Sequence, residues 1–317
     1  MKRLLILLCC FILGTLSLVA QRECVTISTI DEPVNERLLS DFIENIRIIP
    51  YNTDGSAMVP EIGKVYYKRN RLLIVQNGGG SSNRHLFDSK GNYIMDLCKA
   101  SGTCSRQSYS DSGKGGPFCQ QNHGLFVSKR KVLVSEANGN LHIYKLDGKE
   151  TGKNNSREIE KIMLNNSRAN FFSELRKEYL SYNIQNDTVF AISKKNGNKS
   201  SVYVINMGTL RMFYSFNANN RYIWMQDSHN RQDNMIYDMK GRKIVFWGKL
   251  INDLFPGSDV KVVGASTNAF IFCLTNPWQM SVTDKCAELL NKQDLLYVNN
   301  IEEDSDYILF KATIKNQ

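Results

Sequence analysis

Short runs of alternating apolar and polar residues recur along most of the chain after residue 45. Two of them share a motif: "NRHLFDSKGNYI" at 83–94 and "NLHIYKLDGKET" at 140–151 both carry His, an aliphatic, an aromatic and Gly at matched positions. A third copy, "DNMIYDMKGRKIVFW" at 233–247, has Met235 where the first two have His85 and His142. An alternating strand, a turn containing Gly and a second strand are typical of a β-hairpin, so each copy predicts one.

The hairpins recur with a regular period. A looser copy at 200–216 has Val202 and Tyr203 at the aliphatic and aromatic positions. The mean spacing of the aromatic residues is then about 50 residues, within the period of a four-stranded repeat; these residues are Phe87, Tyr144, Tyr203 and Tyr237. Another β-rich run precedes each hairpin, which gives about four strands a unit, the size of a β-propeller blade. With two more β-rich units at 260–276 and 295–315, the pattern predicts an all-β, six-bladed β-propeller of four-stranded antiparallel blades.

Helical signals are few and short. In "NFFSELRKEYL" at 170–180, Phe171, Leu175 and Tyr179 are spaced by four residues, and "SVTDKCAELLNK" at 281–292 starts with a Ser281 to Asp284 capping pattern. Both are expected to be short helical insertions between strands. We expect a signal peptide at 1–20, a lead segment at 21–45 and one propeller domain at 46–317.

The N-terminus has the features of an export signal. Lys2 and Arg3 precede the apolar run "LLILLCCFILG", and the small residue Ala20 precedes the polar Gln21. The run is short for a membrane span, which needs about 20 residues, so cleavage after Ala20 is favoured over an uncleaved anchor. The expected mature protein is periplasmic or secreted, without a transmembrane span.

The charge of the mature chain is mildly positive. Loss of residues 1–20 removes two basic residues and no acid, so the formal charge falls from +9 to +7. Such an excess permits an anionic partner, for example an acidic glycan or a membrane surface, although a solvated basic surface is the simpler interpretation. The export signal argues against nucleic acid as a partner.

The mature chain keeps six cysteines. An even number in an exported chain predicts disulfides, of which six cysteines allow 15 connectivities. The shortest closures join Cys273 with Cys286 and two of Cys98, Cys104 and Cys119. A zinc site is disfavoured because no C-x-x-C pair occurs.

Several stretches resemble the six-bladed β-propeller proteins exported by Bacteroidetes, most of which have no assigned function. These stretches are "IRIIPYNTDG" at 46–55, "EIGKVYYKRNRLLIVQ" at 61–76, "HLFDSKGNYI" at 85–94, "GKGGPF" at 113–118 and "EEDSDYILFKATIK" at 302–315. The resemblance implies a propeller fold and an exported protein. It implies no catalytic residue, because the motifs are structural.

Candidate chemistry is sparse, and no catalytic residue or cofactor is assigned. His85 and His142 favour a structural role in half-buried strands over a metal site. A Ca²⁺ site in the acidic turn of Glu302, Glu303, Asp304 and Asp306 is a weaker alternative to a solvated turn. Trp224, Trp247 and Trp278 could stack on a ligand, although aromatic residues are also ordinary blade core.

Two functional hypotheses follow. The first is a binding or scaffold protein that engages a protein or glycan through loops on one face. The alternative is a lyase or hydrolase with a carboxylate pair, or His with a carboxylate, in the central channel. The sequence leaves the choice open and favours the binding protein.

Overall fold

The computed structural model describes most of the chain after residue 22. The residues that it describes are 23–51, 62–68, 71–76, 84–88, 90–97, 124–126, 131–135, 141–145, 150–153, 170–184, 186–194, 198–206, 213–227, 233–301 and 307–315. The expected signal peptide, Cys98, Cys104, Cys119 and the acidic turn considered for Ca²⁺ lie outside these residues.

The described residues form five β-sheets. Each sheet has four consecutive or nearly consecutive strands paired antiparallel, and two sheets carry a fifth strand. The first two sheets are β4 (Ile62–Lys68), β5 (Arg71–Gln76), β6 (Arg84–Phe87), β7 (Tyr93–Asp96), and β8 (Gly124–Phe126), β9 (Lys131–Ser135), β10 (Leu141–Lys145), β11 (Glu150–Lys153). The third and fourth contain β12 (Asn170–Glu174), β13 (Glu178–Asn183), β14 (Thr188–Ser193), β15 (Lys199–Asn206), and β16 (Phe213–Ala218), β17 (Tyr222–Asp227), β18 (Asp233–Asp238), β19 (Lys243–Ile251). The fifth joins β20 (Asp259–Ala265), β21 (Ala269–Thr275) and β22 (Tyr307–Ile314) to β3 (Ile43–Ile49).

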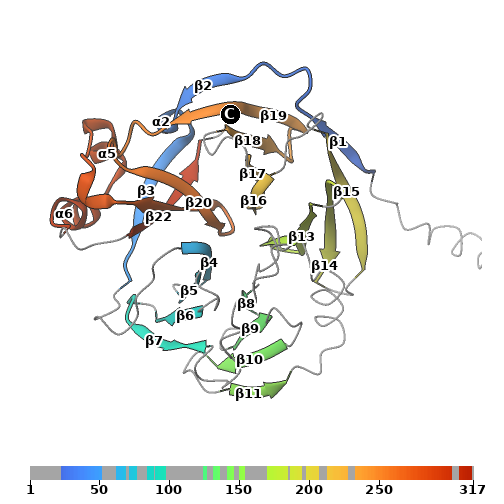
Figure 1. Ribbon diagram of the computed structural model, residues 1–317, viewed down its shortest axis with the longest axis horizontal. Helices are drawn as coiled ribbons and strands as arrows, with labels where there is room; N and C mark the ends of the chain where they lie inside the picture. Colours follow the sequence, from blue (N-terminus) through green and yellow to red (C-terminus); the bar gives the residue numbers. More distant parts are fainter. Residues whose placement is uncertain are drawn as a thin grey trace, which may run out of the picture.

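The sheets are arranged around a centre like the blades of a propeller (Figure 1). The first strands of the sheets face the centre: β20 packs against β4 and β16, β12 against β16, and β4 against β8. The all-β, propeller-like fold is therefore confirmed, but the described residues form five sheets and not the six blades expected. The count was wrong because 260–276 and 295–315 belong to one sheet, in which β21 pairs with β22.

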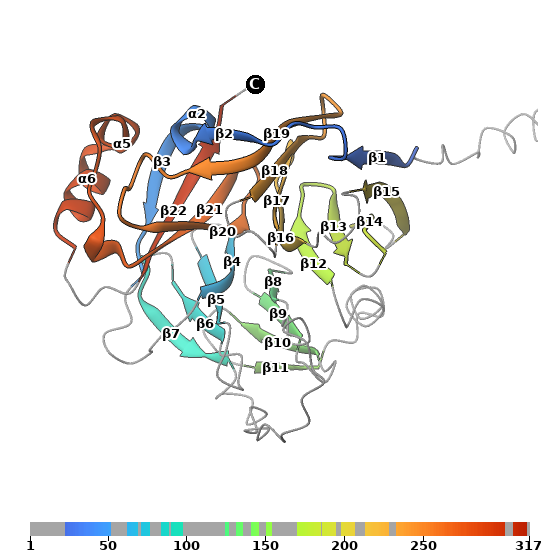
Figure 2. The same ribbon diagram turned by 45° about the horizontal axis from the view of Figure 1, so that its top comes forward.

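The N-terminal segment is part of the propeller. β1 (Val25–Ser28) pairs parallel with β15, β2 (Asn35–Leu38) pairs parallel with β19, and β3 is the outermost strand of the fifth sheet. The segment thus runs along the outer edges of three successive sheets (Figures 1 and 2). Strands that start at residue 25, before the domain start expected at residue 46, thus pair with these sheets.

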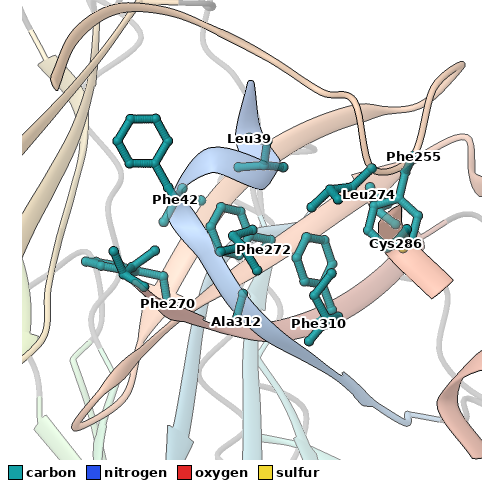
Figure 3. Close-up of a cluster of buried hydrophobic side chains, with 14 of the residues drawn as sticks. Leu39, Phe42, Phe255, Phe270, Phe272, Leu274, Cys286, Phe310 and Ala312 are labelled. Atoms are coloured by element: carbon teal, nitrogen blue, oxygen red, sulfur yellow. The ribbon is translucent and has the colours of Figure 1, made fainter. Parts of the chain in front are cut away.

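Strands that lie between two packed sheets have buried residues on both faces. In β21, Phe270, Phe272 and Leu274 point into one hydrophobic cluster, and Ile271 and Cys273 point into another. Phe272 stacks on Phe310 with ring centroids 4.9 Å apart, and Phe42 from the short helix α2 (Leu39–Phe42) joins the same cluster (Figure 3). Full burial of one such ring contributes roughly 2–3 kcal/mol, so this cluster fastens the N-terminal segment to the fifth sheet.

The repeated motif has a structural basis. Phe87, Tyr144 and Tyr237 lie in β6, β10 and β18, each the third strand of its sheet, which confirms the predicted correspondence. In each of these three sheets the pairing of the third with the fourth strand shifts register between the aliphatic and the aromatic residue of the motif. The motif therefore marks a β-bulge before the hairpin turn, a device that bends a strand and increases its twist.

The looser copy of the motif was placed on the wrong strand. Tyr203 lies in β15, a fourth strand, whereas the same bulge falls between Val189 and Phe190 in β14. Phe190 is thus the true counterpart of Phe87. The mistake arose because "SSVYV" alternates as regularly as a third strand does.

The helical predictions met with mixed results. Residues 170–180 form β12, a turn and β13, so the helix expected there is wrong: Phe172 and Leu180 are buried by neighbouring strands. The helix in 281–292 is confirmed as α5 (Asp284–Leu289), although Thr283, not Ser281, caps it. The run "LLYVNN" lies mostly in the helix α6 (Lys292–Asn299), capped by Asn291, and not in a strand.

Candidate functional site

Turns from several sheets meet on one side of the ring. In an antiparallel sheet the first and third strands run in the same direction, so the turns that follow them lie at the same edge. Hydrogen bonds join these turns between sheets: the Arg176 N–H donates to Asn220 Oδ1, and the Asn220 N–H donates to the Thr267 carbonyl, both at 3.0 Å. We call this surface the turn face. It comprises the turns at 175–177, 219–221, 239–242 and 266–268, the turn residues Asp88, Lys90, Lys194 and Asn198, and the strand ends Lys68 and Arg71.

An ion cluster on the turn face joins two sheets. Glu174 Oε1, at the end of β12, accepts from Lys68 Nζ of β4 at 2.5 Å and from Lys194 Nζ at 2.8 Å. Lys194 also donates to the Leu175 carbonyl and lies 4.9 Å from the centre of the Tyr179 ring. Burial, together with the nearby Glu174 charge, raises the pKa of Tyr179 to about 12, so the phenol stays neutral.

A second ion pair fixes the turn after β18. The Asp238 carboxylate accepts from the Arg221 guanidinium at 3.0 Å and from the backbone N–H groups of Lys240 and Gly241 at 2.8 and 3.0 Å. Burial alone would raise the pKa of Asp238, but these three donors hold the pKa below its usual value. Like Glu174, Asp238 is thus engaged inside the turn face.

The remaining basic side chains on the turn face point into solvent. Arg176 and Lys177 are exposed in the turn between β12 and β13, and Lys240, Arg242 and Lys243 are exposed at the turn between β18 and β19. Of these five, Arg242 forms an ion pair, at 3.3 Å, with the exposed Glu23. Glu174 and Asp238 are therefore paired, and the five exposed side chains of these two turns are basic. At the turn after β6, Asp88 accepts hydrogen bonds from the backbone N–H groups of Lys90 and Asn92, and the Lys90 side chain is exposed.

A separate polar cluster lies among the first strands, at the centre of the ring. Lys64 Nζ in β4 donates to the Phe216 carbonyl at 2.9 Å and to Asn217 Oδ1 at 2.5 Å, both in β16. The Asn217 amide donates in turn to the Val262 carbonyl of β20 at 3.2 Å and to Ser215 Oγ at 3.4 Å. Burial lowers the pKa of Lys64 to about 7, so this amine carries only a partial charge at neutral pH.

The side chains of the central cluster hold first strands of different sheets together by hydrogen bonds. Its polar side chains are amides, a hydroxyl and an amine, and they join β4, β16 and β20 through backbone carbonyls. The enzyme hypothesis required a carboxylate pair or His with a carboxylate at the centre, and neither belongs to this cluster. Among the described residues, no three His, Cys, Asp or Glu side chains are placed to hold a metal ion.

The three tryptophans have different surroundings. Trp224 is fully buried, with its indole N–H donating to Asn234 Oδ1 at 2.9 Å, and Trp247 is also buried, against Phe213. Neither can stack on a ligand, because both are core residues. Trp278, in the 3₁₀ helix η1 (Pro277–Gln279), is 51% exposed, so stacking on a ligand stays a prediction for this residue.

Cys273 and Cys286 form no disulfide. Both thiols are free and buried, and burial raises the pKa of each to about 12. The pairing expected between them is wrong because their side chains occupy different clusters: Cys273 lies in the one with Ile271, and Cys286 in the one with Phe272. Successive side chains of a strand point to opposite faces, so β21 itself separates the two thiols.

His85 and His142 occupy equivalent third strands, as the repeat predicted. His85 is buried, with Nε2 3.4 Å from Gln76 Oε1 and its ring 6.1 Å from that of Tyr93. These surroundings agree with the structural role favoured for it. The sequence offered no comparable signal for Lys64, because only the folded ring brings it against β16.

Comparison with known proteins supports the fold alone. No protein-family profile matches the sequence, and no curated protein matches it either. A crystal structure from Bacteroides fragilis, of a protein described as exported, aligns with a TM-score of 0.56 at 11% identity, covering 93% of this chain and 100% of that one. Glutaminyl cyclase of Myxococcus xanthus aligns at 8% identity over 90% of this chain and 100% of its own, but its TM-score of 0.40 is too low to support an argument.

The part of the chain that the structure describes contains no helix long and apolar enough to cross a membrane.

Proposed function

We propose that this chain is an exported binding or scaffold protein that engages its partner through the turn face. The observation that carries the proposal is the composition of that face. Glu174 and Asp238 are held in internal ion pairs, and Asp88 accepts hydrogen bonds within its own turn. Arg176, Lys177 and Lys240 extend into solvent. Ion pairs and hydrogen bonds between turns hold these charges on a fixed surface, which lowers the entropy cost of binding.

Export is supported by two independent features. The N-terminus has the basic, apolar and small-residue pattern of a cleaved signal peptide, with Ala20 before the expected site. The Bacteroides fragilis protein with a similar fold is also described as exported. Together with the motifs that resemble exported Bacteroidetes propellers, these features favour a periplasmic or secreted location.

A pull-down from the periplasm and culture medium of the source cell tests the binding function. The bait is the mature protein from residue 21, and the comparison is the same protein with Arg176→Glu and Lys177→Glu. A partner, protein or glycan, that the first retains and the second loses supports the proposal. Partners captured equally by both proteins would place the binding surface elsewhere.

A further inference from the structure

We propose that the turn face binds an acidic polysaccharide, a polymer that carries carboxylate or sulfate groups along its length. The inference rests on the proposed binding function and names the class of partner. It starts from basic residues that are far apart in the sequence, Lys68, "LRK" at 175–177 and "MKGRK" at 239–243. Each falls at the C-terminal end of a first or third strand, so the fold gathers them at one edge of the ring.

Hydrogen bonds connect two of these clusters, at 175–177 and 239–243, through neighbouring turns. The Lys194 N–H donates to the Lys177 carbonyl at 3.1 Å, and the Met239 N–H donates to the Arg221 carbonyl at 2.8 Å. Within each of these two sheets, the turn after the first strand is thus joined to the turn after the third strand. The bond from Arg176 to Asn220 then joins the two sheets. A chain of neighbouring turns thus connects Lys177 with Lys240 along an arc of the ring.

The distribution of charge along this arc favours a polymer. Arg176, Lys177, Lys240 and Lys243 are exposed, and they are divided between the turns of two neighbouring sheets. Each such position contributes a small favourable term to the binding free energy of a polyanion, and the repeated charges of the polymer match an extended basic surface. By contrast, the core of a protein–protein interface is depleted of lysine and relies on a few buried anchors, most often Trp, Tyr or Arg.

The same surface is a poor match to a lipid bilayer. Proteins that lie on membranes insert large apolar side chains between the headgroups in addition to their basic residues. The large hydrophobic side chains that are exposed in the described part of the chain lie outside the turn face; they are Ile30, Val34, Val204, Ile251, Trp278, Leu296 and Tyr297. Tyr179 on the turn face is half-buried under Lys194.

Direct binding measurements test the inference on the mature protein. The probes are polygalacturonate and chondroitin sulfate as acidic polysaccharides, dextran as the neutral one, polyglutamate as an acidic peptide, and vesicles of phosphatidylcholine with phosphatidylserine. The turn-face variant is Arg176→Glu with Lys177→Glu. The matched control, Lys249→Glu with Lys292→Glu, changes the net charge by the same amount on β19 and α6, away from the turn face.

We expect binding to at least one acidic polysaccharide, no binding to dextran, and weaker binding at higher salt. The turn-face variant should bind roughly tenfold more weakly or worse, and the control should stay within about threefold of wild type, because only local charges contact the polymer. Equal loss in both variants, preference for polyglutamate or vesicles, or no binding to either polysaccharide would overturn the inference. If the polysaccharide inference fails but capture of a pull-down partner still depends on Arg176 and Lys177, the turn face remains the binding surface and its partner is of another class.

Discussion

Closure of the ring depends on a close contact between β20 and β4, and a single methyl group tests it. Gly264 in β20 lies so near β4 that a Cβ atom there would be 2.2 Å from the Val65 carbonyl oxygen and 3.3 Å from Ile271 Cδ1. A normal contact between carbon and oxygen is about 1 Å longer than the first distance, and its partner is backbone that cannot rotate away. Gly264→Ala must therefore push two first strands apart.

The expected cost follows from known overpacking effects. Forcing extra atoms into a close-packed core costs about 1–3 kcal/mol, and the reduced entropy of the unfolded chain recovers roughly 0.5 kcal/mol. We therefore expect Gly264→Ala to lower the unfolding free energy by about 2 kcal/mol. For a chain of nearly 300 residues this corresponds to a decrease of roughly 3 °C in Tm, measured by scanning calorimetry at one heating rate.

Gly241→Ala is the matched control. A Cβ atom at Gly241 would be 3.3 Å from Asp238 Oδ2, which is about 1 Å longer than the contact at Gly264 and does not involve backbone. Its Tm should stay within about 1 °C of wild type. Equal Tm values for Gly264→Ala and Gly241→Ala would show that β20 and β4 do not pack as described.

Three further predictions concern other parts of the molecule. Lys64 has a pKa of about 7 in the folded protein and near 10.4 in the unfolded chain, so the unfolding free energy should rise with pH between these values. Lys64→Met should abolish that rise. An unchanged pH profile in the variant argues against the buried amine. Alkylation of denatured, unreduced protein should label Cys273 and Cys286, whereas a linked peptide containing both would contradict the free thiols. Gly248→Ala should detach β2, because the added Cβ would lie 2.0 Å from the Asn35 carbonyl oxygen. Amide hydrogen exchange at 35–38 should then be faster than in wild type. Unchanged protection there would refute the pairing of β2 with β19.

The repeating hairpins could be predicted because they are local. The aliphatic, aromatic and Gly residues of 83–94, 140–151 and 233–247 encode a bulge and a turn within some dozen residues, and all three fall on third strands. The alternation of a single strand was less informative. It placed Tyr203 in the wrong strand, since both faces of a blade strand are buried and several strands have similar patterns.

The N-terminal strands could not be predicted from local pattern. Val25 pairs with Tyr203 and Ile46 with Ala312, so the partners are separated by well over a hundred residues. Nothing in "VTIS" or "NERL" distinguishes an added edge strand from a flexible lead segment. This long-range pairing also explains the wrong blade count, because β3 completes the sheet that β20, β21 and β22 begin.

The turn face was present in the sequence only as dispersed charge. The positive charge of the chain was interpreted as a solvated basic surface, because it is a mild excess spread over nearly 300 residues. The convergence of Lys68, 175–177 and 239–243 follows from strand direction, which becomes known once each is assigned to the end of a first or third strand. The three tryptophans show the opposite case: their chemistry suggested a ligand site, and the fold buries Trp224 and Trp247 in the core.

Amide hydrogen exchange of the mature protein with and without an acidic polysaccharide tests the central claim most directly, since it locates the binding surface without mutation. With saturating polygalacturonate or chondroitin sulfate, whichever binds more tightly, protection should increase at 175–177 and 239–242 and stay unchanged in α6. Protection confined to η1 and α6, or no change at either turn, would contradict the assignment of the turn face as the binding surface.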